Sequence, residues 1–346
     1  MASESAGNKR ERRANSYDVA ERAGVSQSTV SRALAGSPTI TQQTRDRVVA
    51  AARELGYFVD ERAARLRRGK TATLAMVVIC RPGELASEIN PFSYALLGAV
   101  CAAASARGLE TLVSFQSEAD QLYAHYVASG QADGLVVIGT PTNRAAWDYF
   151  REAQDGGGPA RAAWWGSPFT GVQALRSDNE TGARAATQHL IERGYRDIVF
   201  LGSPDDAQRQ FAERFEGYAR AMEEAGLAIC QFDTDGAGSR AEQGHAAIAR
   251  LVESGQRFDA VCAACDTIAL GALAELDARG IDVPGAVGIV GFDGVAAGEF
   301  SHPPLSSIRP DFAAAGEMLV ARALGEDGGA ARVPVSLLER GSVRRG

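Results

Sequence analysis

The sequence predicts an α/β protein whose N-terminus folds as a small all-α unit. Residues 16–34 have the pattern of two short amphipathic helices joined by a tight turn. From residue 74 onward, short apolar runs alternate with helical segments, which is typical of parallel sheets covered by helices on both faces. The first 70 residues are basic and the remainder is acidic, so the two parts are expected to have different tasks.

Three helices are predicted between residues 15 and 56. Asn15, Ser26 and Thr41 are suitable N-caps, because their side-chain oxygens can accept hydrogen bonds from the first unpaired backbone N–H groups of a helix. Gly24 suits the left-handed conformation that a tight turn after the first helix requires. We therefore expect a helix-turn-helix that is supported by a third helix.

The second helix leaves one polar face uncovered. At about 100° per residue, this face holds Gln27, Ser28, Ser31 and Arg32. It fits either a DNA reader or an amphipathic hairpin with a solvated polar side. Charge favours the DNA reader: residues 1–70 hold 14 Lys and Arg against eight Asp and Glu, a net of +6, whereas the whole chain carries −7 and the remainder therefore −13. A basic head on an acidic body indicates a nucleic-acid-binding unit joined to a sensing or catalytic one.

The residues YDVAERAGVSQSTVSRAL (17–34) and TQQTRDRVVAAARELGY (41–57) resemble the headpiece of the LacI/GalR family of bacterial transcription regulators, and the resemblance continues through the chain. Gln27, Ser28 and Arg32 are then expected to read base edges, while Ser31 and Thr44 hold phosphates. The predicted DNA-binding set also includes Tyr17, Thr29 and Tyr57. Two positions depart from the family pattern: Ala35 replaces an amide side chain, and Val59 replaces a proline.

Two flanking segments are predicted around this headpiece of residues 15–59. Residues 1–14 are polar and basic without an apolar run, so we expect a disordered arm and not a secretory signal. Residues 60–70 are charged and too short to fold alone, and taken by themselves they indicate a solvated basic linker. The resemblance implies instead a hinge helix that pairs with its counterpart in a dimer and inserts Leu66 into the minor groove, with Ala63 one turn before it.

Residues 71–346 are expected to form the effector-binding and dimerisation domain. This length exceeds one ordinary α/β lobe, and the resemblance implies the two lobes of a periplasmic-binding-protein-like sensor with parallel sheets. We expect the chain to cross between the lobes near residues 167–172 and to return near residues 302–306. Strands are predicted at residues 74–79, 111–115, 134–139, 162–165, 198–202, 260–264 and 287–292.

The chain carries no recognisable enzyme signature. The first strand runs into CRPGEL and not into a G-x-G-x-x-G turn, and no P-loop, H-E-x-x-H pair or G-x-S-x-G elbow is present. The four histidines, His125, His189, His245 and His302, lack the spacing of metal ligands. We therefore expect neither an enzyme nor a metal or cofactor.

Ligands of parallel-sheet lobes bind at the carboxyl ends of the strands. By this rule and by the resemblance, the predicted effector-binding set is Asn90, Phe92, Phe115, Trp165, Arg184, Arg214, Asp266 and Asp293. Aromatic faces suit stacking on a sugar ring or a purine, although plain packing fits them equally well. Arg214 and Asp266 would donate to and accept from ligand hydroxyls. Asp293 is expected to order the loop after its strand more than to touch the ligand.

The five cysteines are odd in number and scattered, which suits reduced thiols in a cytosol. Cys262 and Cys265 form a C-x-x-C pair that permits a redox or metal interpretation. Without a second pair, a packed and inert Cys262 is favoured. Cys265 stands where the family usually has an asparagine, and a thiol is a much poorer hydrogen-bonding group than an amide.

Together these features predict a cytoplasmic, homodimeric transcriptional repressor of a carbohydrate-utilisation operon. It would bind a palindromic, double-stranded operator and respond to a small molecule, expected to be a sugar. Two alternatives stay open: a sugar-binding transport protein, which would need export and no DNA-binding head, and a redox sensor that acts through Cys262 and Cys265. No apolar run of about 18 residues indicates a membrane span, and no leucine heptad follows Val335 to form a tetramerising tail.

Overall fold

The computed structural model describes residues 14–58, 70–85, 88–140, 142–155, 162–169, 173–204, 209–234 and 238–345. The chain divides into two compact units, residues 1–69 and residues 70–346. Most of the predicted arm and hinge, including Ala63 and Leu66, lies outside the described residues. Among the helices of the described ranges, none is long and apolar enough to cross a membrane.

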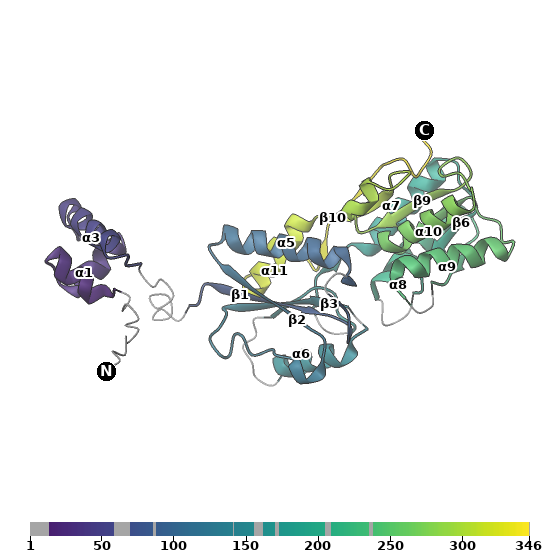
Figure 1. Cartoon of the computed structure of the whole chain (residues 1–346). Coiled ribbons are helices and arrows are strands. Elements are labelled where there is room, and N and C mark those ends of the chain that lie inside the picture. Colours follow the sequence, from purple (N-terminus) through teal and green to yellow (C-terminus); the bar gives the residue numbers. More distant parts are fainter. Residues whose placement is uncertain are drawn as a thin grey trace, which may run out of the picture. The chain divides into compact units, whose positions relative to one another are not determined.

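The first unit contains the three predicted helices (Figure 1): α1 Ser16–Ala23, α2 Gln27–Leu34 and α3 Gln42–Glu54. Their caps are those expected from the sequence. Asn15 Oδ1 accepts from the backbone N–H of Asp18 at 3.2 Å, and Asp18 Oδ2 accepts from the backbone N–H of Asn15 at 2.7 Å, which closes a capping box. Ser26 and Thr41 cap the other two helices, and Gly24 turns the chain at φ +64°. Val19, Val30 and Val48 are buried at the centre of this unit.

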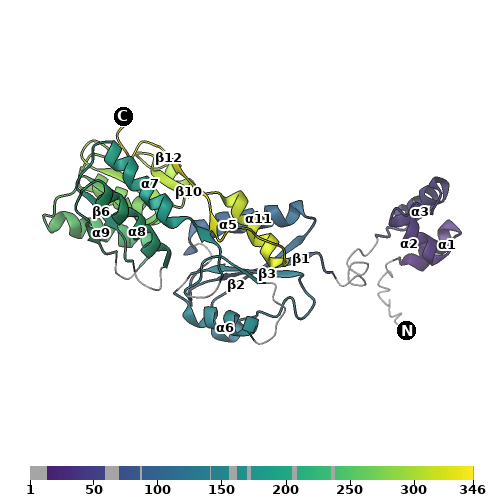
Figure 2. The ribbon, with the colours of Figure 1, turned by 180° about the vertical axis from the view of Figure 1, so that it is seen from behind.

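The first lobe of the second unit is a four-stranded parallel sheet in the order β2-β1-β3-β4. Its strands are β1 Thr73–Ile79, β2 Glu110–Gln116, β3 Gly134–Gly139 and β4 Ala162–Trp164, and its helices are α5 Pro91–Ala106, α6 Arg144–Asp155 and α11 Phe312–Ala323. Helices α5 and α11 cover one face and α6 covers the other (Figures 1 and 2). Strand β1 is buried on both sides, because Leu74 and Met76 pack toward α5 and α11, whereas Val77 packs toward α6.

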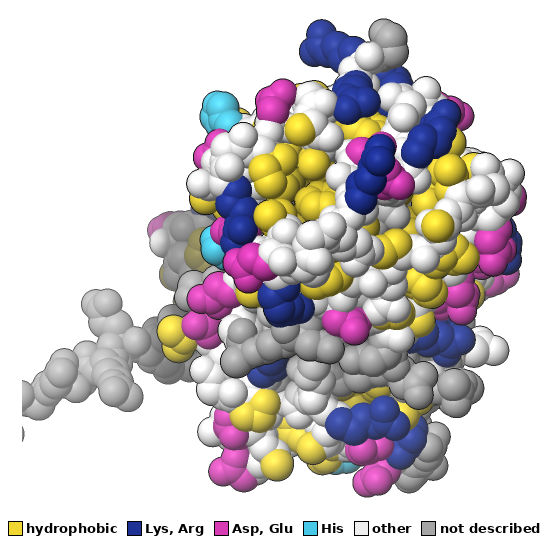
Figure 3. Space-filling model, turned by 90° about the vertical axis from the view of Figure 1, so that its right-hand side faces the viewer, with side chains coloured by type: hydrophobic (Ala, Val, Ile, Leu, Met, Phe, Trp, Pro, Cys, Tyr) yellow, Lys and Arg dark blue, Asp and Glu magenta, His cyan; other side chains and the backbone are white. Residues whose placement is uncertain are grey.

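The second lobe is a six-stranded sheet in the order β12-β10-β9-β8-β6-β7, in which only β12 runs antiparallel to its neighbour. Its strands are β6 Ile198–Leu201, β7 Gln231–Phe232, β8 Ala260–Ala263, β9 Gly288–Phe292, β10 Ser306–Pro310 and β12 Val335–Leu338, and its helices are α7 Asn179–Glu192, α8 Arg209–Glu224, α9 Arg240–Glu253 and α10 Asp266–Ala278. On the face shown in Figure 3, acidic and basic side chains are interspersed with apolar ones.

All seven predicted strands are present, and five further strands were not expected. Two of the unexpected strands, β5 Arg176–Ser177 and β11 Arg332–Val333, pair with each other. They form a two-stranded parallel sheet that is separate from the sheets of the two lobes. They and β7 are only two residues long, so they carry no apolar alternation that a sequence pattern could reveal.

The chain crosses between the two lobes three times. The first crossing runs from Trp164 to Asn179 and includes the predicted segment, of which residues 170–172 lie outside the described ranges. The predicted return at residues 302–306 is wrong, because this loop leads into β10, which pairs with β9 of the second sheet. The chain returns after Pro310, where α11 begins and packs on α5, and it crosses again through β11 to reach β12.

Helices α7 and α8 approach each other closely at Gly217. A Cβ added to Gly217 would lie 2.2 Å from the carbonyl oxygen of Glu180, so Gly217→Ala must push the helices apart. We expect it to lower the free energy of unfolding by roughly 1–3 kcal/mol. The matched control is Gly98→Ala on α5, where an added Cβ meets nothing within 4 Å, and a helical alanine should stabilise by roughly 0.5–1 kcal/mol. Chemical denaturation measures both, and equal effects would contradict the packing argument.

Candidate functional site

The polar face of α2 is directed away from the core of the first unit. Val30 and Ala33, on the opposite face, are 1% and 2% exposed. Ser28, Ser31 and Arg32 are exposed, and Arg32 makes no hydrogen bond or ion pair with any described residue. The helix therefore offers exposed hydroxyl groups and a guanidinium, although the Ser28 hydroxyl also bonds to Ser26 Oγ at 2.9 Å. Groups of these kinds read base edges and phosphates.

The other predicted DNA-binding residues of this unit are less open. Gln27 is half-buried, and its Nε2 donates to Ser16 Oγ at 3.3 Å. Thr29 and Thr44 are half-buried at the caps of α2 and α3, and Tyr57 packs against the helical core. Tyr17 is 70% exposed at the start of α1. The structure thus exposes the side chains at the middle of the polar face of α2. Beside them, Thr29 and Thr44 are held in place by their bonds to the capping residues of α2 and α3.

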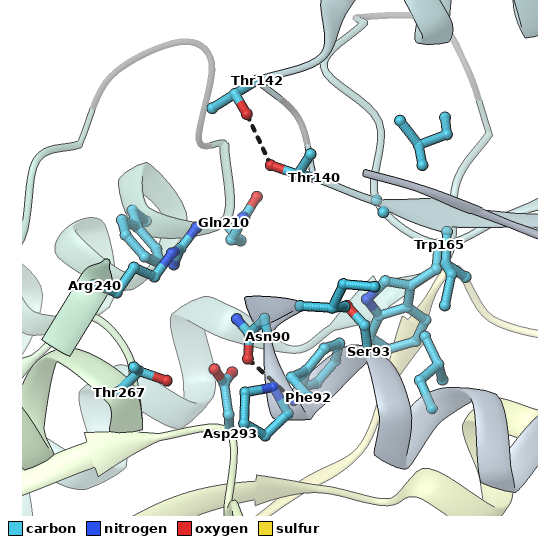
Figure 4. A pocket seen from close by; sticks show the side chains of 18 of the residues that line it. Asn90, Phe92, Ser93, Thr140, Thr142, Trp165, Gln210, Arg240, Thr267 and Asp293 are labelled. Atoms are coloured by element: carbon cyan, nitrogen blue, oxygen red, sulfur yellow. Dashed lines mark hydrogen bonds between the residues drawn. The ribbon is translucent and has the colours of Figure 1, made fainter. Parts of the chain in front are cut away.

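In the second unit a cavity of about 260 Å³ lies between the two lobes. It is formed where the carboxyl ends of strands meet the N-termini of helices, as the rule for parallel sheets predicts. Figure 4 shows Phe92, Ser93 and Trp165 on one side and Gln210, Arg240 and Thr267 on the other. The volume is near the lower end of small-molecule pockets, roughly 300–1,000 Å³, so the cavity suits a single compact metabolite.

Aromatic rings form the wall that the first lobe contributes. The ring centroid of Phe92 lies 5.6 Å from that of Trp165 and 5.4 Å from that of Phe312. Asn90 fixes this arrangement, because its Oδ1 accepts from the backbone N–H of Phe92 at 3.0 Å and caps α5. Thr140 and Thr142, which bond to each other at 2.9 Å, add hydroxyl groups to the cavity. This wall combines apolar faces with hydroxyl hydrogen-bonding groups.

Arg214 is the most constrained polar residue of the opposite wall. Its guanidinium is 6% exposed and donates to Asn179 Oδ1 at 2.9 Å, to the Ala264 carbonyl at 2.6 Å and to Asp293 Oδ1 at 3.0 Å. It also lies 3.7 Å over the ring of Phe292. Three of its five N–H groups are therefore used by described residues, and two are left for a ligand.

Asp293 both lines the cavity and anchors Arg214. Its backbone is held at φ +120°, and its N–H donates to the Ile308 carbonyl at 2.8 Å. Burial raises the pKa of the Asp293 carboxyl, and the adjacent Arg214 opposes this shift. The carboxylate therefore ties the loop after β9 to Arg214 and also lines the cavity.

Three predicted effector residues do not line the cavity. Asp266 is completely buried, where its oxygens accept from Ser307 Oγ at 2.6 Å and from the Val295 backbone N–H at 2.7 Å. Burial and the nearby Asp293 raise the pKa of the Asp266 carboxyl to about 7. The structure does not place Asp266 where it could accept from ligand hydroxyls, because its carboxyl is completely buried and does not line the cavity.

Arg184 and Phe115 are also outside the cavity. Arg184 lies five residues into α7, roughly 7.5 Å from the helix start at 1.5 Å per residue, and its exposed guanidinium pairs with Glu224 at 2.8 Å. Phe115 is 47% exposed on the edge strand β2, beside Tyr94. The structure therefore brings together five of the eight predicted residues: Asn90, Phe92, Trp165, Arg214 and Asp293.

Several residues that line the cavity do not belong to the predicted effector-binding set. Thr140 directly follows β3 and Thr267 lies in the first turn of α10, so the rule of strand ends could have found both. Other polar residues of the second lobe come from β5 and the first turns of α7, α8 and α9, where no apolar run marks the position: Arg176, Asn179, Arg209, Gln210 and Arg240.

The two cysteines of the C-x-x-C pair are free and buried. Burial raises the pKa of Cys262 to about 11 and also raises that of Cys265. Cys265 is the N-cap residue of α10 but makes no side-chain cap bond, and Arg240 Nη1 donates to its sulfur at 3.6 Å. Both thiols are therefore protonated and shielded at neutral pH, which argues against the redox alternative. Within the described residues, no group of three or more His, Cys, Asp or Glu could hold a metal ion.

Comparisons with known proteins extend over both units. Residues 17–59 match the family of bacterial regulatory proteins, lacI family, and residues 187–343 match the periplasmic binding protein-like domain. The transcriptional regulator CelR of Thermobifida fusca is 33% identical over 305 residues, which cover 86% of this chain and 87% of that protein. The transcriptional repressor CytR of Escherichia coli strain K12 is 29% identical over 305 residues, which cover 87% of this chain and 86% of that protein.

Solved structures show the same architecture. The CelR–cellobiose complex has 30% identity and a TM-score of 0.63, and it covers 95% of this chain and 100% of that one. The Lac repressor dimer bound to operator and the anti-inducer ONPF has a TM-score of 0.75 at 23% identity, and the match covers 96% of this chain and 99% of that one. This likeness concerns the fold only. The relatives that match across head and body are transcriptional regulators and not enzymes. This chain belongs to the LacI family of bacterial transcriptional regulators.

Proposed function

We propose that this chain is a cytoplasmic repressor that binds a palindromic operator as a homodimer and is switched by a small carbohydrate between its lobes. The genes it controls would serve carbohydrate use. The observation that carries the proposal is the presence, in one chain, of an exposed polar face on α2 and of a cavity lined by aromatic and hydroxyl groups. One serves to read DNA and the other to sense a metabolite.

DNA reading in this proposal divides the exposed residues of the first unit by chemistry. The planar guanidinium of Arg32 can donate two bonds to guanine, and Gln27 can pair with adenine. Ser31, Thr44 and Tyr17 would hold phosphates, which position the helix without reading sequence. Two copies of α2 in a homodimer would read two half-sites, so the operator would be palindromic.

The hinge would join DNA binding to ligand binding. Ala63 and Leu66 lie outside the described residues, and the resemblance implies that Leu66 enters the minor groove when the hinge folds against its partner. A wedge of this kind kinks DNA at a cost that added contacts repay. Ligand that touches both lobes would favour one arrangement of the lobes, and so one spacing of the two hinges in the dimer.

Carbohydrate is the ligand class that the first-lobe wall supports. Phe92 and Trp165 supply apolar ring faces, and Ser93, Thr140 and Thr142 supply hydroxyl groups. Sugars present one apolar ring face together with many hydroxyls, so they match both parts of this wall. The relative CelR has been solved with cellobiose, which supports the same class for this chain.

Arg32→Ala tests the base-reading role. We expect it to remove roughly 1–3 kcal/mol of discrimination between the operator and random DNA, while affinity for random duplex changes little. The operator would first be selected from random duplexes with the unaltered protein, and fluorescence anisotropy would then measure both affinities. Arg22→Ala is the control, because Arg22 is an exposed arginine of the same unit that pairs with Glu54. Equal loss on both DNAs would make Arg32 a phosphate ligand.

Trp165→Ala tests the cavity. A panel of neutral, phosphorylated and acidic saccharides would be screened by thermal shift, and the binders titrated by calorimetry. We expect the variant to weaken binding by at least about tenfold, because a ring face is lost, and Phe115→Ala, an exposed aromatic outside the cavity, to change nothing. Saccharide binding should also alter operator affinity. A panel in which no saccharide changes operator affinity would refute the proposed switch.

A further inference from the structure

The second-lobe wall of the cavity is unusually rich in arginine. Four arginines line it and come from two helices and one short strand: Arg176 on β5, Arg209 and Arg214 on α8, and Arg240 on α9. The hydroxyl groups of a neutral sugar both donate and accept hydrogen bonds, so a site for such a sugar needs acceptors as well as donors. Guanidinium groups only donate. The composition of this wall therefore calls for a ligand that is rich in acceptors.

The positive charge of this wall is only partly balanced. Arg214 has its own carboxylate in Asp293, at 3.0 Å. A single carboxylate, that of Glu213, faces three guanidinium groups: Arg332 at 3.0 Å, Arg176 at 3.1 Å and Arg209 at 3.6 Å. Glu213 is 9% exposed and also accepts from Asn179 Nδ2. Two positive charges around it are thus left without a carboxylate among the described residues, which do not include Asp205 and Asp206 just before Arg209.

Arg176 shows the imbalance most directly. Its side chain is 15% exposed, and its Nε is buried without a hydrogen-bond partner among the described residues. Burial lowers the pKa of Arg176, Glu213 opposes this shift, and repulsion from Arg332 and Arg209 adds to it. An arginine stays protonated in a protein, and a buried donor without an acceptor is costly. The excess positive charge around Arg176 therefore costs stability, and an anion bound in the cavity would reduce this cost.

The surrounding backbone favours negative charge at the same wall. Cavity-lining residues occupy the first turns of α7, α8, α9 and α10, whose N-termini carry partial positive charge. The carboxylates of the first-lobe side are placed differently: Glu84 pairs with Arg81 at 2.9 Å, and Glu88 is exposed. An anionic group in the cavity would therefore turn toward the second lobe, away from these glutamates.

We propose that the ligand is a saccharide-sized molecule that carries an anionic group, a phosphate or a carboxylate, which Arg176 and Arg209 bind. Its ring lies on Phe92 and Trp165, and its charged end reaches the second lobe. Because the two ends contact different lobes, such a ligand bridges them. This inference rests on the proposed function of the cavity and specifies the class of its ligand.

Matched ligand triplets test the inference on the full-length chain. Calorimetry would compare glucose, glucose 6-phosphate and glucuronate, the corresponding galactose series, and inorganic phosphate. We expect charged members to bind at least about tenfold more tightly than their neutral parents, because charge-assisted bonds to arginine are the stronger ones. Binding should weaken as NaCl rises, and inorganic phosphate should compete. Preference for the 6-phosphates or for the uronates identifies which anion the site takes.

Arg176→Gln removes the charge and keeps a polar side chain. We expect it to lower the affinity for the charged ligands by about tenfold or more, to leave any neutral parent unaffected, and to maintain or raise the melting temperature of the free protein. Arg184→Gln is the control, because Arg184 is an exposed arginine outside the cavity. Charged ligands that bind Arg176→Gln as tightly as the unaltered protein, or failure of every charged probe to bind, would overturn the inference.

The two proposals fail in different ways. Neutral sugars that bind best and change operator affinity would leave the proposed function standing and refute the anionic ligand. Charged sugars that bind through Arg176 without any effect on operator affinity would support the anionic site and refute the switch.

Discussion

The parallel arrangement of the strands is the constraint on which the cavity between the lobes depends. In both lobes the strands of the central sheet point the same way, apart from β12, so the helices that follow them begin at one edge. The cavity lies where these edges of the two lobes face each other. Short polar residues at helix starts, such as Asn90, Asn179 and Thr267, then reach the same space although they are distant in sequence. The cavity thus depends on strand direction before it depends on any one side chain.

Arg214 ties this edge of the second lobe together. Its three bonds reach the start of α7 at Asn179, the end of β8 at Ala264 and the loop after β9 at Asp293. A buried ion pair of this kind adds little net stability, because desolvation of both charges offsets their attraction. It does specify geometry, since each element must meet the planar guanidinium at one angle. A ligand that binds the two remaining N–H groups would therefore be linked through Arg214 to all three elements.

Local signals in the sequence were sufficient for the three helices of the first unit and for seven strands, but not for β10 Ser306–Pro310 and β12 Val335–Leu338. The caps at Asn15, Ser26 and Thr41 depend on neighbouring atoms only, and apolar runs of four or more residues mark buried strands. The site was only partly predictable, because side-chain direction depends on tertiary packing. Asp266 and Asp293 both follow strands of the second lobe, yet one points into the protein toward Ser307 and the other lines the cavity. No local pattern distinguishes these two carboxylates.

The path of α11 has a consequence for synthesis of the chain. This helix covers the face of the first sheet formed by Leu74, Met76 and Val78, but it is encoded after the whole sheet-and-helix sequence of the second lobe up to β10. Domains generally fold as they leave the ribosome, the N-terminal part first. The first lobe stays incomplete until residue 323 has emerged, because part of its apolar face has no cover before then. The second lobe in turn lacks β12 until residue 338 has emerged. A nascent chain that ends within the second lobe therefore exposes apolar surface of the first lobe, and exposed apolar surface of this kind favours aggregation.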